Sequence, residues 1–140
     1  MEVEEEPLNP RIYSILRLIF ALVISFLITS GLDWVLGRWS LHLYVDVANQ
    51  TLTPFYLVVL FIGTLVGALI AKRFFLSASV AVYLIVSAYA VHTIQRVSEN
   101  VQNAPTYFEI FSQATISLAS GAIIIVLACL VVSKLKRNLY

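Results

Sequence analysis

Charged residues are scarce in this sequence. Only 12% of its 140 residues are Asp, Glu, Lys or Arg, whereas 60% are hydrophobic and the mean hydropathy is +0.90. A soluble globular domain usually carries about 25% charged residues. A soluble fold of this length could not bury so much apolar surface, whereas a lipid bilayer accepts it. The composition therefore indicates one membrane domain over residues 1–140.

Cysteine is almost missing as well. The single Cys129 excludes an internal disulfide, a CxxC metal or redox motif, and the chemistry of four-helix quinone-linked disulfide enzymes. The net charge is only +1, and no basic block stands outside the expected helix ends, so nothing indicates a nucleic-acid partner. HExxH and Ser-His-Asp patterns are also missing. No catalytic residue and no cofactor is predicted, and an enzyme is not the favoured interpretation.

Four long apolar runs fill most of the chain. Each approaches the ~20 residues that cross ~30 Å of hydrocarbon, where only a helix pairs all backbone polar groups of an unbroken run. Residues 1–8 form an acidic tail that is expected to be mobile, and its acidic opening differs from the basic start of a secretory signal. The sequence predicts an all-α membrane protein, an antiparallel bundle of four transmembrane helices. The helices are expected at about residues 11–36, 54–71, 75–95 and 107–133.

Three of the expected helix starts carry capping residues. Asn9-Pro10 and Thr53-Pro54 each place a capping side chain before a proline that fits the first helical turn. Thr106 and Glu109 have the spacing of a capping box, in which each side chain accepts a bond from the other residue's backbone N–H.

Basic residues predict the orientation. With the N-terminus inside, seven lie on the cytoplasmic side and two, Arg38 and Arg96, lie outside. The expected location is the plasma (inner) membrane, with both termini cytoplasmic. The seven are Arg11, Arg17, Lys72, Arg73, Lys134, Lys136 and Arg137.

Small and polar residues recur four apart in each run, which keeps them on one slowly drifting helix face. Because lipid tails are as apolar as Leu, close packing and interhelical hydrogen bonds must hold the helices together. We expect these stripes to hold one bundle together; the alternative is that the Gly63/Gly67 pair, a GxxxG motif, faces a second protein. The packing residues are Ser25, Thr29, Gly63, Gly67, Ser87, Gln113, Ser117 and Gly121.

Polar chemistry is concentrated at the expected outer ends of the helices. If these ends converge, the residues form a candidate binding cluster; otherwise they are interfacial groups that contact water and lipid headgroups. A haem or metal site is a minor alternative, because His42, Asp46 and His92 lie at that boundary and neutral imidazole is a good ligand. The cluster comprises Asp33, Arg38, His42, Asp46, His92, Arg96, Glu99 and Glu109.

A coupled transporter usually needs an ionisable group deep in the membrane. Arg17 is the most deeply placed, about two turns into the first run, and its long stem can snorkel to the cytoplasmic face. Small four-helix multidrug exporters are similar in length, but they carry a Glu within the first helix and often a weak charge bias. This chain departs from them on both points.

Two functional hypotheses follow. The first is a non-catalytic accessory or structural subunit that assembles in the bilayer with itself or with a larger membrane protein. The second is a small oligomeric transporter or lipid-carrier flippase subunit. A water-filled cavity lined by Arg17, Ser25, Asp33 or Gln113 would favour the second, and a dry, closed core would weaken it.

Overall fold

The structure is a computed structural model that describes residues 9–37, 45–47, 50–52, 54–71, 74–100 and 103–138. These residues form four helices and two short strands. The helix bounds lie within a few residues of the expected ranges, and the largest difference is that the last helix runs on to Asn138. The elements are α1 (Pro10–Gly37), β1 (Val45–Val47), β2 (Gln50–Leu52), α2 (Pro54–Ile70), α3 (Phe75–Ser98) and α4 (Tyr107–Asn138).

Three helices, α1, α3 and α4, are long and apolar enough to cross a membrane. The fourth, α2, is also apolar and contains no charged residue, but it has only 17 residues. The strands form a small antiparallel hairpin between α1 and α2, with Asp46 opposite Thr51.

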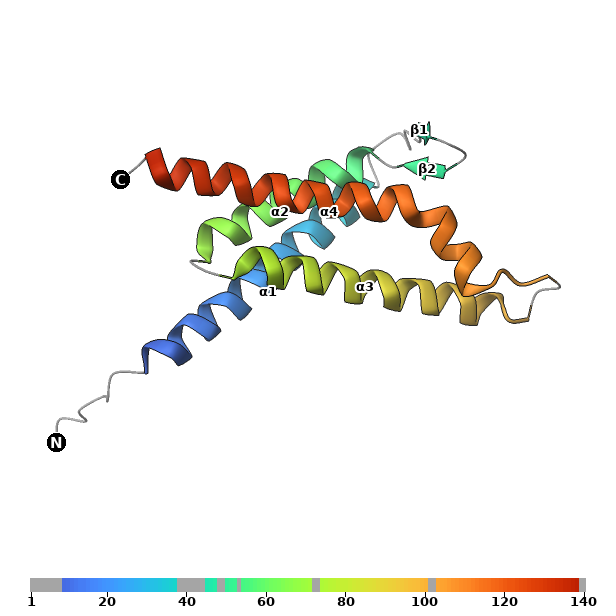
Figure 1. Cartoon of the computed structure of the whole chain (residues 1–140), viewed down its shortest axis with the longest axis horizontal. Coiled ribbons are helices and arrows are strands. Elements are labelled where there is room, and N and C mark those ends of the chain that lie inside the picture. Colours follow the sequence, from blue (N-terminus) through green and yellow to red (C-terminus); the bar gives the residue numbers. More distant parts are fainter. Residues whose placement is uncertain are drawn as a thin grey trace.

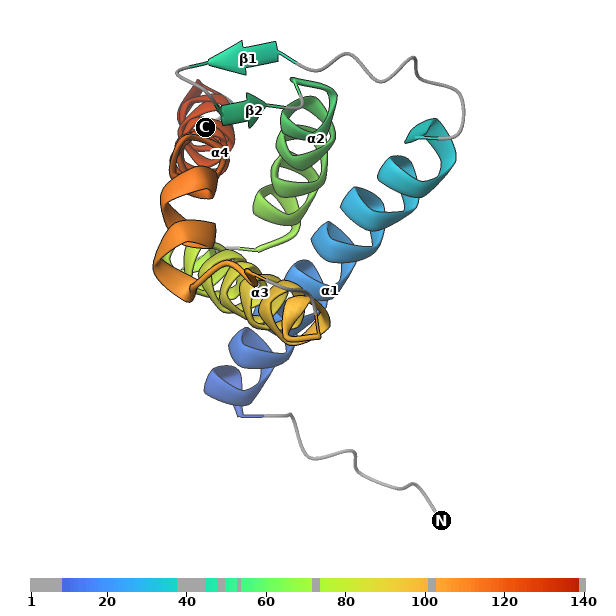
Figure 2. The same ribbon diagram turned by 90° about the vertical axis from the view of Figure 1, so that its right-hand side faces the viewer.

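Successive helices run in opposite directions (Figure 1). Helix α1 begins and α4 ends at one end of the bundle, here called the termini end, while the β-hairpin lies at the other, the hairpin end. Helix α1 packs on α2, α2 on α4, and α4 on α3, whereas α1 and α3 contact each other much less. Figure 2 shows α1 and α3 diverging toward the hairpin end. The bundle is therefore closed on three sides and looser on the α1/α3 side.

The described helix starts confirm the capping predictions. The backbone N–H of Arg11 donates to Asn9 Oδ1 at 3.1 Å. The backbone N–H of Thr106 donates to Glu109 Oε2 at 2.7 Å, and that of Glu109 donates to Thr106 Oγ1 at 3.3 Å, which completes the capping box. The third expected cap, Thr53, lies outside the described residues.

The two glycines of the GxxxG motif lie against α1. A Cβ added to Gly63 would lie 2.8 Å from the backbone oxygen of Ser25 and would overlap Thr29 Oγ1. A Cβ on Gly67 would lie 2.9 Å from Ser25 Cβ and would overlap the ring of Phe75. These glycines therefore pack inside the chain, and the alternative that they face a second protein is wrong.

On helix α4, Ser117 and Gly121 of the predicted stripe contact α3, whereas Gln113 does not. Gly121 lies under the ring of Tyr83, and the Tyr83 hydroxyl donates to the backbone oxygen of Ser117 at 3.4 Å. Gln113 was expected on the same face but is exposed. At 3.6 residues per turn, each step of four rotates the position by about 40°, so two steps carry Gln113 off the packed face.

Two cations cap the end of α2. Arg17 Nε donates to the backbone oxygen of Ile70 at 2.6 Å, and Lys136 Nζ donates to those of Ala68 and Ala71 at 3.1 and 2.9 Å. The last carbonyls of a helix lack intrahelical partners and carry partial negative charge. Arg17 therefore has a specific protein partner, where the sequence suggested only snorkelling toward headgroups.

A small buried cluster lies beside these capped carbonyls. Ala21 and Val132 are almost fully buried in it, and the ring of Phe75 fills the space beside Gly67. The cluster closes the bundle at its termini end. Its buried members are Ala21, Ala68, Ala71, Phe75 and Val132.

We expect Gly63→Ala to destabilise the protein by about 1–3 kcal/mol, because the new methyl group overlaps α1 and the backbone there must move. Gly31→Ala is the matched control, because a Cβ at Gly31 meets nothing within 4 Å. It should be neutral or slightly stabilising, since Ala favours a helix over Gly by about 1 kcal/mol. Thermal unfolding in mild detergent, followed by circular dichroism, measures both. Equal melting temperatures would contradict the α1–α2 contact described.

We expect Lys136→Met to destabilise the protein by about 1–3 kcal/mol, since it removes two charge-assisted hydrogen bonds from the end of α2. Hydrogen–deuterium exchange should rise in the last turn of α2. The exposed Lys134 lies two residues away on the same helix, so Lys134→Met is the control and should leave exchange in α2 unchanged. Identical exchange in the two variants would show that Lys136 does not cap the helix.

Candidate functional site

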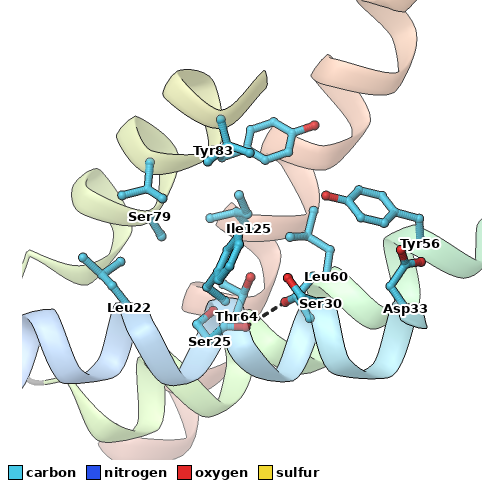
Figure 3. Close-up of a pocket in the computed structure, with 14 residues that line it drawn as sticks. Leu22, Ser25, Ser30, Asp33, Tyr56, Leu60, Thr64, Ser79, Tyr83 and Ile125 are labelled. Atoms are coloured by element: carbon cyan, nitrogen blue, oxygen red, sulfur yellow. Dashed lines mark hydrogen bonds between the residues drawn. The ribbon is translucent and has the colours of Figure 1, made fainter. Parts of the chain in front are cut away.

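A partly open cavity of about 240 Å³ lies among the four helices (Figure 3). With ~30 Å³ per molecule in the liquid, this volume has room for roughly eight waters. Helices α1 and α3 form its sides, and α2 and α4 contribute the residues between them. The lining residues are Leu22, Ser25, Phe26, Thr29, Ser30, Asp33, Tyr56, Leu60, Thr64, Ser79, Val82, Tyr83, Val86 and Ile125.

The cavity runs along the half of α1 nearer the hairpin end. It extends from Leu22 to Asp33, which is about 16 Å at ~1.5 Å per residue. Leu22 also packs against the buried cluster at the termini end, so the cavity is closed there. Its residues at the α1/α3 opening are exposed: Phe26 by 54%, Val82 by 38% and Val86 by 46%. The cavity therefore has a closed inner end, and its exposed lining residues are these three apolar ones together with Ser30 and Asp33.

Hydroxyl groups dominate the polar part of the wall. Thr29 Oγ1 donates to the backbone oxygen of Ser25 at 2.9 Å, and Ser79 Oγ donates to that of Leu76 at 3.0 Å. A hydroxyl that donates its hydrogen to the backbone still has lone pairs with which it can accept. The wall can therefore accept hydrogen bonds from a guest. The hydroxyl residues are Ser25, Thr29, Ser30, Tyr56, Thr64, Ser79 and Tyr83.

Asp33 adds a carboxylate at the hairpin end of the cavity. In Figure 3 it lies beside Tyr56 of α2, and Tyr83 reaches toward the same space from α3. Tyr83 can lie this close to α4 because Gly121 has no side chain. Two aromatic rings and one carboxylate thus come from three different helices to one part of the wall.

The other members of the predicted outer cluster separate. His92 Nδ1 lies 2.7 Å from the Tyr107 hydroxyl, and the two rings stack with centroids 6.1 Å apart. Glu109 belongs to the α4 capping box, while Arg96 and Glu99 are exposed at the end of α3. Among the described residues, these side chains do not share one pocket, and of the predicted cluster only Asp33 lines the cavity.

Arg38 and His42 of the predicted cluster lie outside the described residues, so the haem or metal alternative, which uses His42, rests partly on a residue that the structure does not describe. Asp46 lies in strand β1 and not in a helix. Within the residues that the structure describes, no group of three His, Cys, Asp or Glu side chains could hold a metal ion.

Several cavity residues were missed as binding residues, although the pattern containing them was visible. Ser25, Thr29 and Asp33 stand four apart in α1, and Ser79 and Tyr83 stand four apart in α3. The sequence interpretation assigned such stripes to helix packing. Tyr56 and Thr64 belong to no predicted stripe, and only the fold brings them to this wall.

Comparison of the chain with protein-family models, with curated proteins and with solved structures found no match.

We expect a cysteine at position 30 to be reached by water through the cavity. In a Cys129→Ala background, Ser30→Cys should react with N-ethylmaleimide at least about tenfold faster than Gly31→Cys, because a thiol in lipid ionises poorly. Gly31 is the neighbouring residue and has open space around it, so it differs mainly in facing away from the cavity. Both cysteines should react equally after denaturation in SDS. Equal rates in the folded bilayer-embedded protein would mean that the cavity is dry.

Proposed function

We propose that all four helices cross the bilayer, with the termini end in the cytoplasm and the hairpin end outside, in the plasma (inner) membrane. The 17 residues of α2 fall at the lower limit of the ~17–25 residues of a spanning helix. The central position of α2 supports its crossing, since it packs against both α1 and α4. The basic Arg17 and Lys136 at the termini end agree with the excess of cytoplasmic positive charge.

We propose that the protein takes an amphipathic molecule from the bilayer into its cavity, as a small transporter or lipid-carrier subunit. The observation that carries this proposal is a cavity whose largely apolar wall carries hydroxyl groups and one carboxylate, and which is open between α1 and α3. Polar groups at membrane depth need partners, because hydrocarbon offers none. A molecule with a polar head and an apolar body would satisfy the hydroxyls and the apolar wall together.

The position of the small-residue stripes also supports a carrier over a purely structural subunit. Gly63 and Gly67 pack against α1, and Gly121 packs under Tyr83, so these glycines are used within one chain. Of the four residues whose presence around a cavity would favour transport, Ser25 and Asp33 line it. The other two have different positions, because Arg17 caps α2 and Gln113 is exposed.

The accessory-subunit hypothesis, the first of the two drawn from the sequence, becomes the second candidate: here the protein assembles with itself or with a larger membrane protein. It is favoured by the looser α1/α3 side, where Phe26, Val82 and Val86 present exposed apolar side chains. A helix of a second copy or of another protein would cover this side. Such a helix would occupy the position that the carrier hypothesis assigns to the guest.

Protection of the cysteine at position 30 tests the carrier hypothesis. The protein in lipid nanodiscs is titrated with three ten-carbon amphiphiles, decyltrimethylammonium, decyl sulfate and decyl glucoside, and the rate of maleimide labelling is measured. At least one should slow labelling of Ser30→Cys saturably without affecting Gly31→Cys. If none of the three does so, the proposed function is wrong.

A matched pair of tryptophan variants locates the entry. Val82→Trp should abolish the protection, because Val82 lines the cavity at its rim and the larger ring would fill the opening. Ile85→Trp should retain it, since Ile85 is 67% exposed on the same helix and does not line the cavity. Equal protection in both variants would argue against entry between α1 and α3.

A further inference from the structure

Resting on the proposed function, we infer that the guest is a cationic amphiphile. Its positive head group lies beside Asp33 and Tyr56, with Tyr83 farther along the same wall, and its apolar body leaves through the α1/α3 opening. Three features of the cavity lead to this class of ligand: its charge, its aromatic residues and the position of its exposed apolar residues.

The charge of the lining is one-sided. Of the 14 described residues that line the cavity, Asp33 is the one acidic residue, and none of these 14 is Lys, Arg or His. The described cations nearest the bundle interior, Arg17 and Lys136, are bonded to the carbonyls of α2 at the opposite end. An anionic head group beside Asp33 would therefore meet a like charge, which repels it, with no cation among these described lining residues to offset the repulsion.

The aromatic residues favour the same sign of charge. The face of a Tyr ring attracts a cation within about 6 Å of its centroid, and the attraction grows when the cation leaves water. Tyr56 of α2 lies beside Asp33, and Tyr83 of α3 lies farther along the same wall, beyond the Tyr56 hydroxyl (Figure 3). The remaining polar wall consists of hydroxyl oxygens with lone pairs to offer. A positively charged head group would be attracted by the carboxylate, by the tyrosine rings and by the hydroxyl oxygens.

The apolar surfaces define where the body of the guest lies. Leu60 and Ile125 form apolar parts of the wall contributed by α2 and α4. Phe26, Val82 and Val86 stand at the open side with their side chains exposed. A hydrocarbon chain whose head is at Asp33 would pass between them into the lipid. This direction matches an amphiphile that enters sideways from the membrane.

The inference narrows the proposed function. A lipid carrier that bears a phosphate or diphosphate would place its negative charge beside Asp33 without a cation among the lining residues to offset it. An aminolipid or another hydrophobic amine has the matching charge. We therefore favour an amine over a phosphate-bearing lipid, and the experiment below distinguishes the two.

The test compares head groups on one chain length. In nanodiscs of uncharged lipid, decyltrimethylammonium should protect Ser30→Cys from maleimide at a concentration at least about tenfold lower than decyl sulfate, a difference of ~1.4 kcal/mol. Asp33→Asn should weaken protection by the ammonium compound about tenfold and leave protection by decyl glucoside unchanged. Glu99→Gln is the control, because it removes an exposed carboxylate outside the cavity. It should leave protection by both the ammonium compound and decyl glucoside unchanged.

A second variant tests the ring contribution independently of Asp33. Tyr56→Leu should weaken protection by decyltrimethylammonium severalfold, whereas Tyr56→Phe, which keeps a ring, should preserve most of it. If decyl sulfate protects as well as the ammonium compound, or if both Asp33→Asn and Tyr56→Leu leave ammonium protection unchanged, the inference is wrong while the carrier function stands. If none of the three amphiphiles protects, the proposed function fails and the inference fails with it.

Discussion

The close approach of α1 to α2 at Gly63 and Gly67 is the constraint on which the rest of this structure depends. Lipid provides no hydrophobic force between helices, so association depends on backbones that can come close together. Because Gly63 and Gly67 have no side chain, α1 can approach α2 closely at Ser25. Any larger residue at either position would clash with α1. With α1 held on α2 and α2 held on α4, α3 attaches mainly through α4. The α1/α3 side is left as the looser one, and the cavity lies there.

The two described cations nearest the bundle interior lie at the opposite end of the bundle from Asp33. At the termini end, Arg17 and Lys136 neutralise the partial negative charge of α2's last carbonyls. Toward the hairpin end, Asp33 and the tyrosines line a cavity with no basic residue among its described lining residues. Arg17 and Lys136 are engaged in holding a helix end and do not balance Asp33. This separation gives the cavity its preference for positive charge.

Local sequence rules were sufficient for the helices and their starts. Asn9 and the Thr106/Glu109 box cap α1 and α4 as their side-chain chemistry predicts, because a cap depends on residues only a few positions apart. The small-residue stripes were also recognised. A stripe identifies a face, however, and does not state which helix that face meets. The contact of Gly63 with α1 follows from the fold.

The cavity could not be predicted from the sequence, because local patterns do not tell which helices meet. Its wall combines Asp33, Tyr56 and Tyr83, which belong to three helices and are far apart in the chain. Whether a serine or threonine stripe packs tightly or borders an open space depends on how neighbouring helices diverge, and no local pattern encodes that divergence. Gln113 illustrates the opposite case, since its stripe was extrapolated over two steps of four and rotated off the contact face.

The shortness of α2 has a consequence for the surrounding lipid. Its 17 residues span only about 26 Å, a few ångströms less than an average hydrocarbon core. Arg17 and Lys136 bring their charges to its last turn. With α2 across the bilayer, as proposed, the polar boundary on that side would lie closer to the bilayer centre at α2 than elsewhere. Lipids accommodate such a mismatch by local thinning, at a fraction of a kcal/mol per ångström. With α2 across the bilayer, the protein would shorten the apolar path that a polar head group has to cross beside it.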